Sequence, residues 1–448
     1  MGTTLLRANV VVTLDNQYNI YQPGYLVVKD GRLTEVGPQS ALNEQRFDFD
    51  QVTQVDLEGR LVMPGLVNAH THAPMVLFRG LAEGYSLLTF EGWYNGIRVW
   101  EEVMDAQMVP PAVAVSCAEM IRTGTTCFAD QYFYMDRAVP VVRQSGMRAA
   151  LAYGIVERGD QAAREREIAA ATAFLEEAQD DARITGWVGP HALFVDNSPE
   201  AIRMELELAD RFETGLHIHL ATRGEEDNYC REQYGRSAVQ QMQALGVLDR
   251  RMLAAHCIAV PPDDFPTLAA YPFSAVIAAS AGMRSGGGVA PLQAMRQAGI
   301  NIALGTDNVA NNNSYDMFNE MQTAAKVMSL REGQPNVIPA RDILEMATLG
   351  GARALGMENE IGSLEPGKKA DLITLDLTDI GWGPVGSQDV CTALVYSVCG
   401  LHVRDVMVDG NWLLREGTWT TLDYTSAGTE LDTAHAELRK RFRLQRPV

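Results

Sequence analysis

Apolar and polar residues alternate through residues 1–60, in runs such as "GYLVVKDGRLTEVG". Such alternation predicts half-buried β-strands. The pair Asp30-Gly31 between two of these runs predicts a tight hairpin turn. The same alternation of apolar and polar residues returns near the end of the chain, where Asp409-Gly410 separates "VRDVMV" from "NWLLREG". The two β-rich ends therefore predict one small β-sandwich domain built from residues 1–60 and 364–425.

The middle of the chain, residues 61–363, alternates short apolar runs with longer helical stretches. This pattern indicates βα units and a parallel sheet. The eight candidate strands span residues 61–70, 125–130, 148–154, 184–190, 215–220, 252–256, 274–280 and 301–307. Eight such units in about 300 residues match a (β/α)8 barrel. A doubly wound open sheet would need a glycine-rich phosphate loop after its first strand, and the sequence lacks one. We predict an α/β protein with this barrel over 61–363 and a C-terminal helix over 426–448.

Histidines and aspartates collect at the ends of the candidate strands. Five of the runs end in, or lead directly into, such a residue, and a sixth contains one: His70, Asp130, His191, His256, Asp307 and, within the run, His219. The carboxyl ends of the strands form the active-site face of a barrel. This placement therefore predicts a catalytic site.

A metal site explains most of these residues. His70 and His72 are two residues apart on a strand, so both imidazoles can face one cation. His219 is the predicted third ligand. Asp307 is the fourth, and it can also take a proton from an attacking water. Such a ligand set suits one divalent ion, first of all Zn²⁺, with Fe²⁺, Co²⁺ or Mn²⁺ as alternatives.

Two further histidines lie within the candidate strands. We expect His256 to polarise or hold the substrate beside the metal; the alternative is a hydrogen bond that orients a ligand. His217 lies one layer deeper than His219, and we expect a hydrogen-bonded core residue there.

The composition agrees with a catalyst of small molecules. The 448 residues are 46% apolar and 21% charged, and the net charge is 37 − 57 = −20. Without a basic cluster, binding of nucleic acid or of an anionic membrane is not expected. No apolar run is long enough to predict a membrane span. Six cysteines without a CxxC pair indicate reduced thiols and a cytoplasmic location.

Several longer motifs run from about residue 60 to residue 412. They include "MPGLVNAHTHAPM", "GPHALF", "HIHLA", "AAHC", "LGTDNVANNNSYDMFNEM" and "GSLEPGKKADLITLDL". Together they resemble the amidohydrolase superfamily, in particular its branch of methylthioadenosine/S-adenosylhomocysteine deaminases and triazine hydrolases. The resemblance implies the same barrel and β-sandwich and one metal ion. It implies His70, His72, His219 and Asp307 as ligands, His256 beside the substrate, and a homo-oligomer.

One position departs from the deaminase pattern. Deaminases of this branch carry a glutamate three residues after the histidine ligand of the fifth strand, where it moves a proton from water to a ring nitrogen. Here that position is Thr222, whose hydroxyl does not titrate near neutral pH. Glu225 and Glu226 follow, and a shifted loop could bring one inward. The more ordinary interpretation is that both are solvated charges.

The predicted substrate contacts come from several segments. Trp93 and the pair Glu101/Glu102 fall where the family places an aromatic cover and a ribose-binding acid, and Glu102 is the predicted ligand. The alternative is a helix that packs through its tryptophans with its acids in water. Tyr153 stands where nucleoside deaminases tend to carry arginine, which makes the pocket less polar. The remaining predicted contacts are His191, Thr222 and Asn308.

These observations favour a metal-dependent hydrolase of a non-peptide C–N bond, in an amide, carbamate or urea of a small, fairly apolar substrate. A carbonyl needs no ring protonation, so a threonine at position 222 is tolerable. The second hypothesis is a deaminase or dechlorinase of an N-heterocycle such as an adenosine, a pterin or a triazine. Asn308 directly after Asp307 resembles the triazine hydrolases. The third hypothesis, a non-catalytic scaffold, is disfavoured because all four predicted ligands are present.

Overall fold

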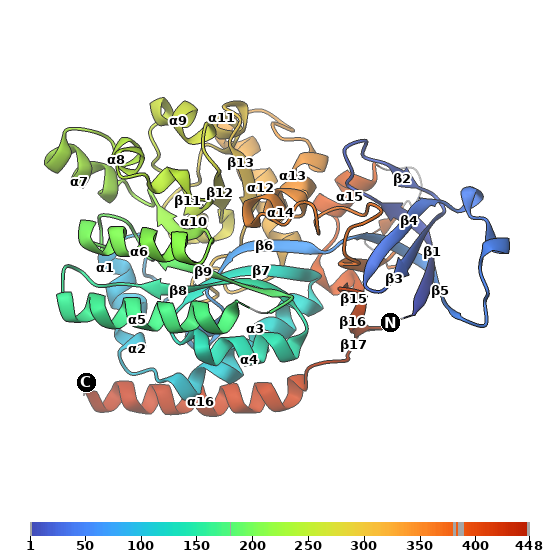
Figure 1. Ribbon diagram of the computed structural model, residues 1–448, viewed down its shortest axis with the longest axis horizontal. Coiled ribbons are helices and arrows are strands. Elements are labelled where there is room, and N and C mark those ends of the chain that lie inside the picture. Colours follow the sequence, from blue (N-terminus) through green and yellow to red (C-terminus); the bar gives the residue numbers. More distant parts are fainter. Residues whose placement is uncertain (1, 180, 380–381, 384–388, 446–448) are drawn as a thin grey trace.

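The centre of the molecule is a parallel sheet of eight strands. The computed structural model describes residues 2–179, 181–379, 382–383 and 389–445. The strands follow one another in the order β13-β12-β11-β10-β9-β8-β7-β6 (Figure 1). Their bounds are β6 (Leu66–Thr71), β7 (Thr125–Tyr132), β8 (Arg148–Ile155), β9 (Ile184–Pro190), β10 (Leu216–Leu220), β11 (Met252–His256), β12 (Phe273–Ile277) and β13 (Asn301–Leu304). Each corresponds to one of the eight predicted runs.

The first and last strands meet and close the sheet. Thr71 and Asp307 form an isolated parallel bridge. Beside it, the side chain of Asn68 accepts a hydrogen bond from the Thr306 amide at 2.9 Å and donates one to the Thr306 hydroxyl at 2.7 Å. This seam confirms the predicted barrel, and it places the strand-end residues of β6 next to those that follow β13.

Helices surround the barrel and connect its strands. They are α3 (Val109–Arg122), α4 (Met135–Ser145), α5 (Gln161–Ala178), α6 (Pro199–Arg211), α7 (Glu225–Tyr234), α8 (Ala238–Ala244), α9 (Phe265–Ala269), α10 (Ala279–Arg284), α11 (Leu292–Gln297), α12 (Met317–Glu332), α13 (Ala340–Met346) and α14 (Leu349–Leu355). The segment between β6 and α3 holds η3 (Ala73–Phe78), α1 (Phe90–Trp93), η4 (Tyr94–Arg98) and α2 (Val99–Glu101). This segment lies over the carboxyl end of the first strand.

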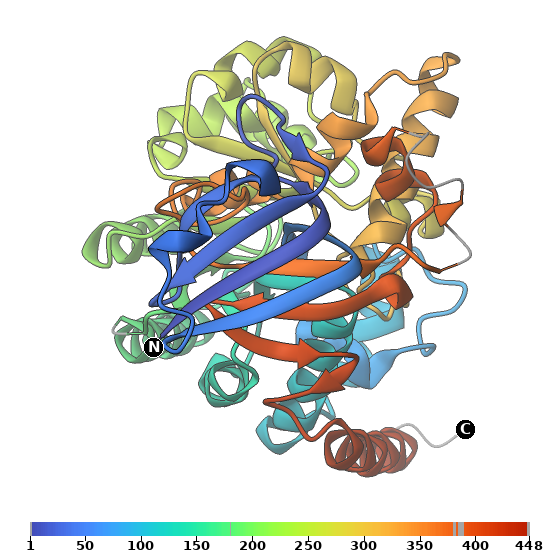
Figure 2. The same ribbon diagram turned by 90° about the vertical axis from the view of Figure 1, so that its right-hand side faces the viewer.

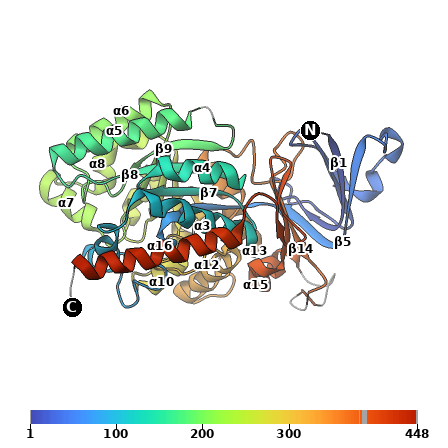
Figure 3. The ribbon, with the colours of Figure 1, turned by 90° about the horizontal axis from the view of Figure 1, so that it is seen from below.

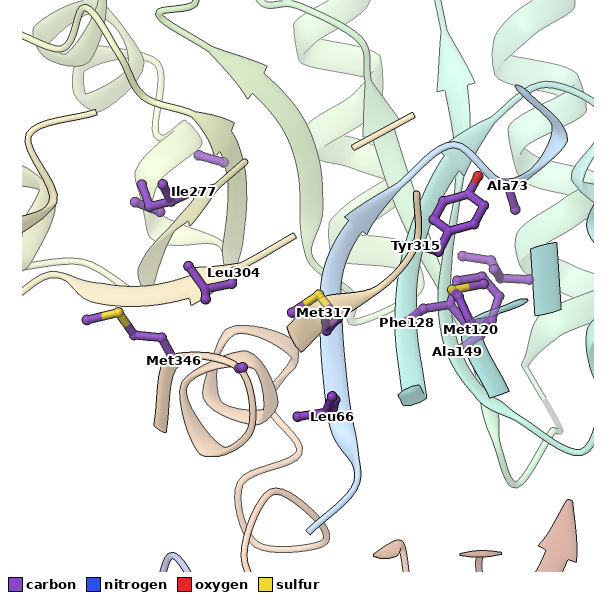
Figure 4. Packing of buried hydrophobic residues seen from close by; sticks show 14 of the residues in the cluster. Leu66, Ala73, Met120, Phe128, Ala149, Ile277, Leu304, Tyr315, Met317 and Met346 are labelled. Carbon is purple, nitrogen blue, oxygen red and sulfur yellow. The ribbon is translucent and has the colours of Figure 1, made fainter. Parts of the chain in front are cut away.

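Apolar side chains fill the space between strands and helices. Leu66 of β6, Phe128 of β7 and Tyr315, just before α12, are fully buried, and Figure 4 shows them in one cluster. Complete burial of such a side chain contributes about 1.5–3 kcal/mol. Tyr315 also donates a hydrogen bond from its hydroxyl to the carbonyl of His72 at 3.1 Å. The core therefore holds the backbone of a predicted metal ligand.

Both ends of the chain build a second, mixed sheet (Figure 2). Its strands are β1 (Thr3–Val12), β2 (Ile20–Tyr21), β3 (Gly24–Lys29), β4 (Arg32–Pro38), β5 (Val52–Pro64), β14 (Leu372–Asp376), β15 (Val403–Val408), β16 (Asn411–Arg415) and β17 (Thr418–Trp419). β14 of the C-terminal part pairs with β5 of the N-terminal part. The strands of the two parts are therefore hydrogen-bonded into one sheet. Asp30-Gly31 and Asp409-Gly410 form the two predicted hairpin turns, with positive φ at all four residues.

The two domains are joined by one nearly continuous strand. Only Gly65 separates β5 from β6, and a Cβ there would lie 2.1 Å from the Thr126 hydroxyl, so this close approach requires glycine. A buried ion pair between Arg148 and Asp371, 2.9 Å apart, links the barrel to the segment entering β14. The domain boundaries after residues 60 and 363 stay a prediction.

The C-terminal helix α16 (Tyr424–Gln445) runs along α3 (Figure 3). Arg441 pairs with Asp105 at 2.6 Å, and the ring of His435 donates to the carbonyl of Leu77 at 2.7 Å. The predicted helix began at residue 426, and its last three residues, 446–448, lie outside the described part of the chain. Among the described residues no helix has the length and apolar character to cross a membrane.

Candidate metal centre

Four predicted ligands converge at the carboxyl end of the barrel. His70 is the second-last residue of β6, His72 directly follows the strand, His219 lies in β10, and Asp307 comes three residues after β13. The Nε2 atoms of His72 and His219 are 3.2 Å apart. One carboxylate oxygen of Asp307 lies 3.6 Å from Nε2 of His70 and 3.4 Å from Nε2 of His72. The three histidines can thus present nitrogen atoms to one ion, and Asp307 lies beside them.

Hydrogen bonds on the far side of each ring fix the tautomers. Nδ1 of His72 faces the carbonyl of Gln131 at 2.6 Å, and Nδ1 of His219 faces the carbonyl of His191 at 2.9 Å. A carbonyl only accepts, so both Nδ1 atoms carry the proton and both Nε2 atoms keep a lone pair. The two lone pairs meet at close range, which a shared cation stabilises.

His70 is oriented by a second histidine. Its Nδ1 lies 2.8 Å from Nε2 of His217, while its own Nε2 is buried without a hydrogen-bond partner among the described residues. Burial lowers the pKa of His217 to about 3, so that ring is neutral and its Nε2 can accept a hydrogen bond from Nδ1–H of His70. His217 is therefore the hydrogen-bonded core residue that the sequence predicts, and its partner His70 is a predicted metal ligand.

Burial also keeps the ligands neutral. It lowers the pKa of both His70 and His219 well below the usual range, and the neighbouring histidines lower it further. Neutral imidazoles are the form that binds metals. Three neutral rings and the carboxylate of Asp307 make a donor set that fits a zinc-type divalent ion. The buried Nε2 of His70, which has no hydrogen-bond partner among the described residues, also fits such an ion.

Asp307 is held in an unusual backbone conformation. Its φ is +59°, and its amide donates to the carbonyl of His70 at 2.9 Å. Asn308 donates from its side chain to Oδ1 of Asp307 at 3.0 Å. Gly305 allows this approach, because a Cβ there would lie 2.7 Å from the His70 amide. Strained conformations of this kind gather at functional sites.

His256 approaches the same centre from the next strand. Its φ is +74°, and its ring nitrogen Nδ1 is buried without a hydrogen-bond partner among the described residues. His256, His70 and Asp307 form a second group whose ligand atoms lie within 4.8 Å of one another. Burial lowers the pKa of His256, although the charge of Asp307 acts in the opposite direction. A neutral ring facing the cavity can donate one hydrogen bond to a substrate.

A cavity opens over this centre. His72, His219, His256 and Asp307 contribute to its floor, and the rest of the lining is mostly apolar: Met75, Leu87, Leu88, Phe90, Trp93, Phe133 and Val195. The rings of Trp93 and His191 lie 5.6 Å apart. Nδ1 of His191 is 2.5 Å from a carboxylate oxygen of Asp196. Burial disfavours the charged form of His191, but Asp196 prevails and raises its pKa.

Four of the six predicted substrate contacts line this cavity, namely Trp93, His191, Thr222 and Asn308. Tyr153 does not. Its hydroxyl bonds to Glu167 of α5 at 3.0 Å, and the next residue, Gly154, lines the cavity instead. Alternate residues of a strand face opposite sides, so the sequence identified the correct strand end but the wrong side chain.

Glu102 lies on the exposed side of its segment, and Glu101 lines the cavity in its place. The side chain of Glu101 is only 5% exposed, and it accepts a hydrogen bond from Tyr132 at 2.8 Å and pairs with Arg98 at 3.2 Å. The helix is α-helical at both ends and π-helical over Tyr94–Arg98. This wider turn changes which of two adjacent acids points inward, and no simple periodicity predicts it.

Glu226 also lines the cavity and is 2% exposed. The interpretation of Glu226 as a solvated charge is therefore wrong. Glu225 is half-buried and lines the cavity as well. Sequence spacing gave no sign of which acid turns inward, because the loop after β10 has no regular period.

The barrel and its floor of three histidines and an aspartate define a class: metal-dependent hydrolases that activate a water molecule at the carboxyl ends of the strands. The family model described as "Amidohydrolase family" matches residues 61–413. The chain belongs to the amidohydrolase family. This confirms the predicted class, a metal-dependent hydrolase of C–N bonds.

Two named deaminases are similar over almost the whole chain. A 5'-deoxyadenosine deaminase from Methanosarcina acetivorans is 36% identical over 442 residues, which cover 98% of this chain and 99% of the relative. A 5-methylthioadenosine/S-adenosylhomocysteine deaminase from Moorella thermoacetica is 37% identical over 428 residues, or 94% and 96% of the two chains.

Solved structures share the fold. An adenosine deaminase from Xanthomonas campestris with bound zinc superposes with a TM-score of 0.89 at 28% identity and covers 98% of each chain. An atrazine chlorohydrolase from Arthrobacter aurescens, complexed with zinc, has a TM-score of 0.86 at 20% identity, over 96% of this chain and 100% of the other. The second likeness shows the common fold alone.

Proposed function

We propose that this protein is a hydrolytic deaminase of an adenosine-like nucleoside with an apolar 5' end. The observation that carries the proposal is the 36% identity, over 98% of this chain, to a 5'-deoxyadenosine deaminase. We further infer one divalent ion, most simply Zn²⁺, held by His70, His72, His219 and Asp307, and a homo-oligomeric assembly in the cytoplasm.

The cavity supports a nucleoside substrate. Trp93 offers an aromatic face, and aromatic faces stack on purine bases. Glu101 offers a buried carboxylate, which accepts hydrogen bonds from sugar hydroxyls. Apolar side chains such as Leu87, Leu88 and Phe133 suit a 5' group without charge.

Each residue has a defined task in deamination. A bound divalent ion would lower the pKa of the attacking water towards ~7. Asp307 accepts a proton from the attacking group and passes it to the leaving nitrogen. His256 donates a hydrogen bond to the oxygen that becomes the carbonyl of the product. Asn308 holds the Asp307 carboxylate in place through their 3.0 Å hydrogen bond.

A second candidate follows from Thr222. The hydroxyl in the wall of the cavity cannot protonate a ring, and a carbonyl substrate needs no such step. Hydrolysis of an amide, carbamate or urea therefore remains the alternative.

A substrate panel separates the two candidates. We expect the zinc-loaded protein to release ammonia from 5'-deoxyadenosine and methylthioadenosine, with kcat/KM at least tenfold above that for adenosine. Aryl ureas, carbamates and amides form the other arm of the panel. Turnover of these carbonyl compounds, with none of any nucleoside, would contradict the proposal.

A further inference from the structure

The segment after the fifth barrel strand folds back on itself. β10 ends at Leu220, and Ala221 then takes a φ of +50°, a left-handed conformation that costs energy in alanine. The helix α7, at the end of the barrel far from the second sheet (Figure 1), begins four residues later at Glu225. A hydrogen bond from the Ala221 amide to the side chain of Glu226 ties the first turn of α7 to the end of the strand.

The carboxylate of Glu226 occupies the inside of this reversal. One oxygen, Oε1, accepts a hydrogen bond from the Ala221 amide at 3.1 Å. The other, Oε2, is buried and has no hydrogen-bond partner among the described residues. An unpartnered buried carboxylate oxygen is costly unless something else satisfies it. Glu226 lines the same cavity as Thr222 and His256, where the proposed substrate would bind.

The surroundings of Glu226 suit proton transfer. The pKa of Glu226 is raised to about 7. Burial is the main cause, and the charges of Glu225 and Asp196 also raise it, whereas hydrogen bonds from its own amide and from that of Ala221 lower it. A group with a pKa near the working pH both accepts and donates a proton efficiently. The hydroxyl of Thr222 does not titrate near neutral pH.

We propose that Glu226 is the catalytic proton-transfer residue of this enzyme, delivered by the first turn of α7 rather than by the strand-end position that Thr222 occupies. The inference rests on the proposed deamination and deepens it. Glu226 would supply the carboxyl group that deamination needs and that position 222 lacks.

Deamination needs two proton transfers. The carboxylate of Glu226 takes one proton from the attacking water and gives it to the ring nitrogen beside the amino-bearing carbon. The water oxygen bonds to that carbon, and the ring C=N becomes a single bond. Asp307 moves the second proton from this oxygen to the amino group. The C–N bond then breaks with its electron pair, and the products are ammonia and a ring lactam.

The test uses the full-length, zinc-loaded protein and the substitution Glu226→Gln. Glutamine keeps the length of the side chain and an oxygen for the Ala221 amide, but it cannot exchange a proton. We expect kcat for methylthioadenosine to fall by about 10²–10⁴-fold. The matched control is Glu232→Gln, an exposed position on the same helix, for which kcat stays within twofold of wild type.

Other readouts separate a catalytic role from a structural one. Zinc content and the circular dichroism spectrum of Glu226→Gln should match those of the wild type. In wild type, kcat/KM should fall as the pH drops below about 7, because Glu226 becomes protonated, and this acid limb should be lost in the variant. A tenfold or larger recovery of kcat in the double variant Thr222→Glu, Glu226→Gln would support the role independently.

The outcomes distinguish the two proposals. If the wild type deaminates nucleosides and Glu226→Gln retains kcat within threefold, the role of Glu226 is overturned and the deaminase function stands. If the zinc-loaded wild type deaminates no nucleoside, the proposed function itself is overturned.

Discussion

The two sides of the cavity are built in different ways. On the metal side, His70, His219 and Asp307 lie on or just after barrel strands, and the seam between β6 and β13 fixes the register of His70 and Asp307. Elsewhere in the cavity lining, Glu226 and Glu101 come from helical turns that follow or precede irregular segments. Rigid strands hold the ligands, whereas the groups that would choose and protonate the substrate depend on local turns. Chemistry and specificity can therefore change without disturbing the metal centre.

The largest effect is expected on the metal side. Asp307→Asn keeps the shape and the hydrogen bond to Asn308 but removes the charge and the proton acceptor. We expect kcat to fall by at least about 10³–10⁴-fold while the circular dichroism spectrum is unchanged. Activity near the wild-type rate would mean that the base lies elsewhere.

The adjacent residues Glu101 and Glu102 allow a matched comparison of a buried and an exposed acid. Glu101→Gln removes a buried carboxylate from the cavity, so kcat/KM for a nucleoside should fall by about 10–100-fold, chiefly through KM. Glu102→Gln changes an exposed neighbour and should leave both constants within twofold of wild type. The reverse order of effects would restore the original prediction that Glu102 binds the substrate.

The smallest effect concerns the support beneath the metal. His217→Leu fills a similar volume but cannot hold Nδ1 of His70, which lies 2.8 Å from the His217 ring. Zinc affinity, measured by competition with a chelator, should fall by about 10–100-fold. At saturating zinc kcat should recover to within threefold of wild type. Unchanged zinc affinity would show that the hydrogen bond does not orient the ligand.

The same contrast explains what the sequence could predict. The eight strands, both hairpins and the convergence of the four predicted ligands follow from periodicity, turn residues and the position of histidines and an aspartate at strand ends, because a strand fixes which side chains share a face. Tyr153 shows the limit even there, since a shift of one residue reverses the face. Its neighbour Gly154 lines the cavity instead.

The errors lie where backbone geometry departs from regular periods. The π-helical turn over Tyr94–Arg98 selects Glu101 over Glu102. The left-handed Ala221 reverses the chain, so that Glu226 points inward rather than to solvent. Neither feature has a simple sequence signature, because alanine rarely adopts a positive φ and a π-turn has no characteristic composition.

One measurement tests the central claim most directly: a crystal structure of the zinc-loaded protein with the deaminated product of methylthioadenosine, phased at the zinc absorption edge. We predict a single anomalous peak bound by His70, His72, His219 and Asp307, and a Glu226 carboxylate oxygen within hydrogen-bond distance of the protonated ring nitrogen. Product bound in the cavity with Glu226 more than one water molecule away from that nitrogen, or an ion outside these four ligands, would contradict the account.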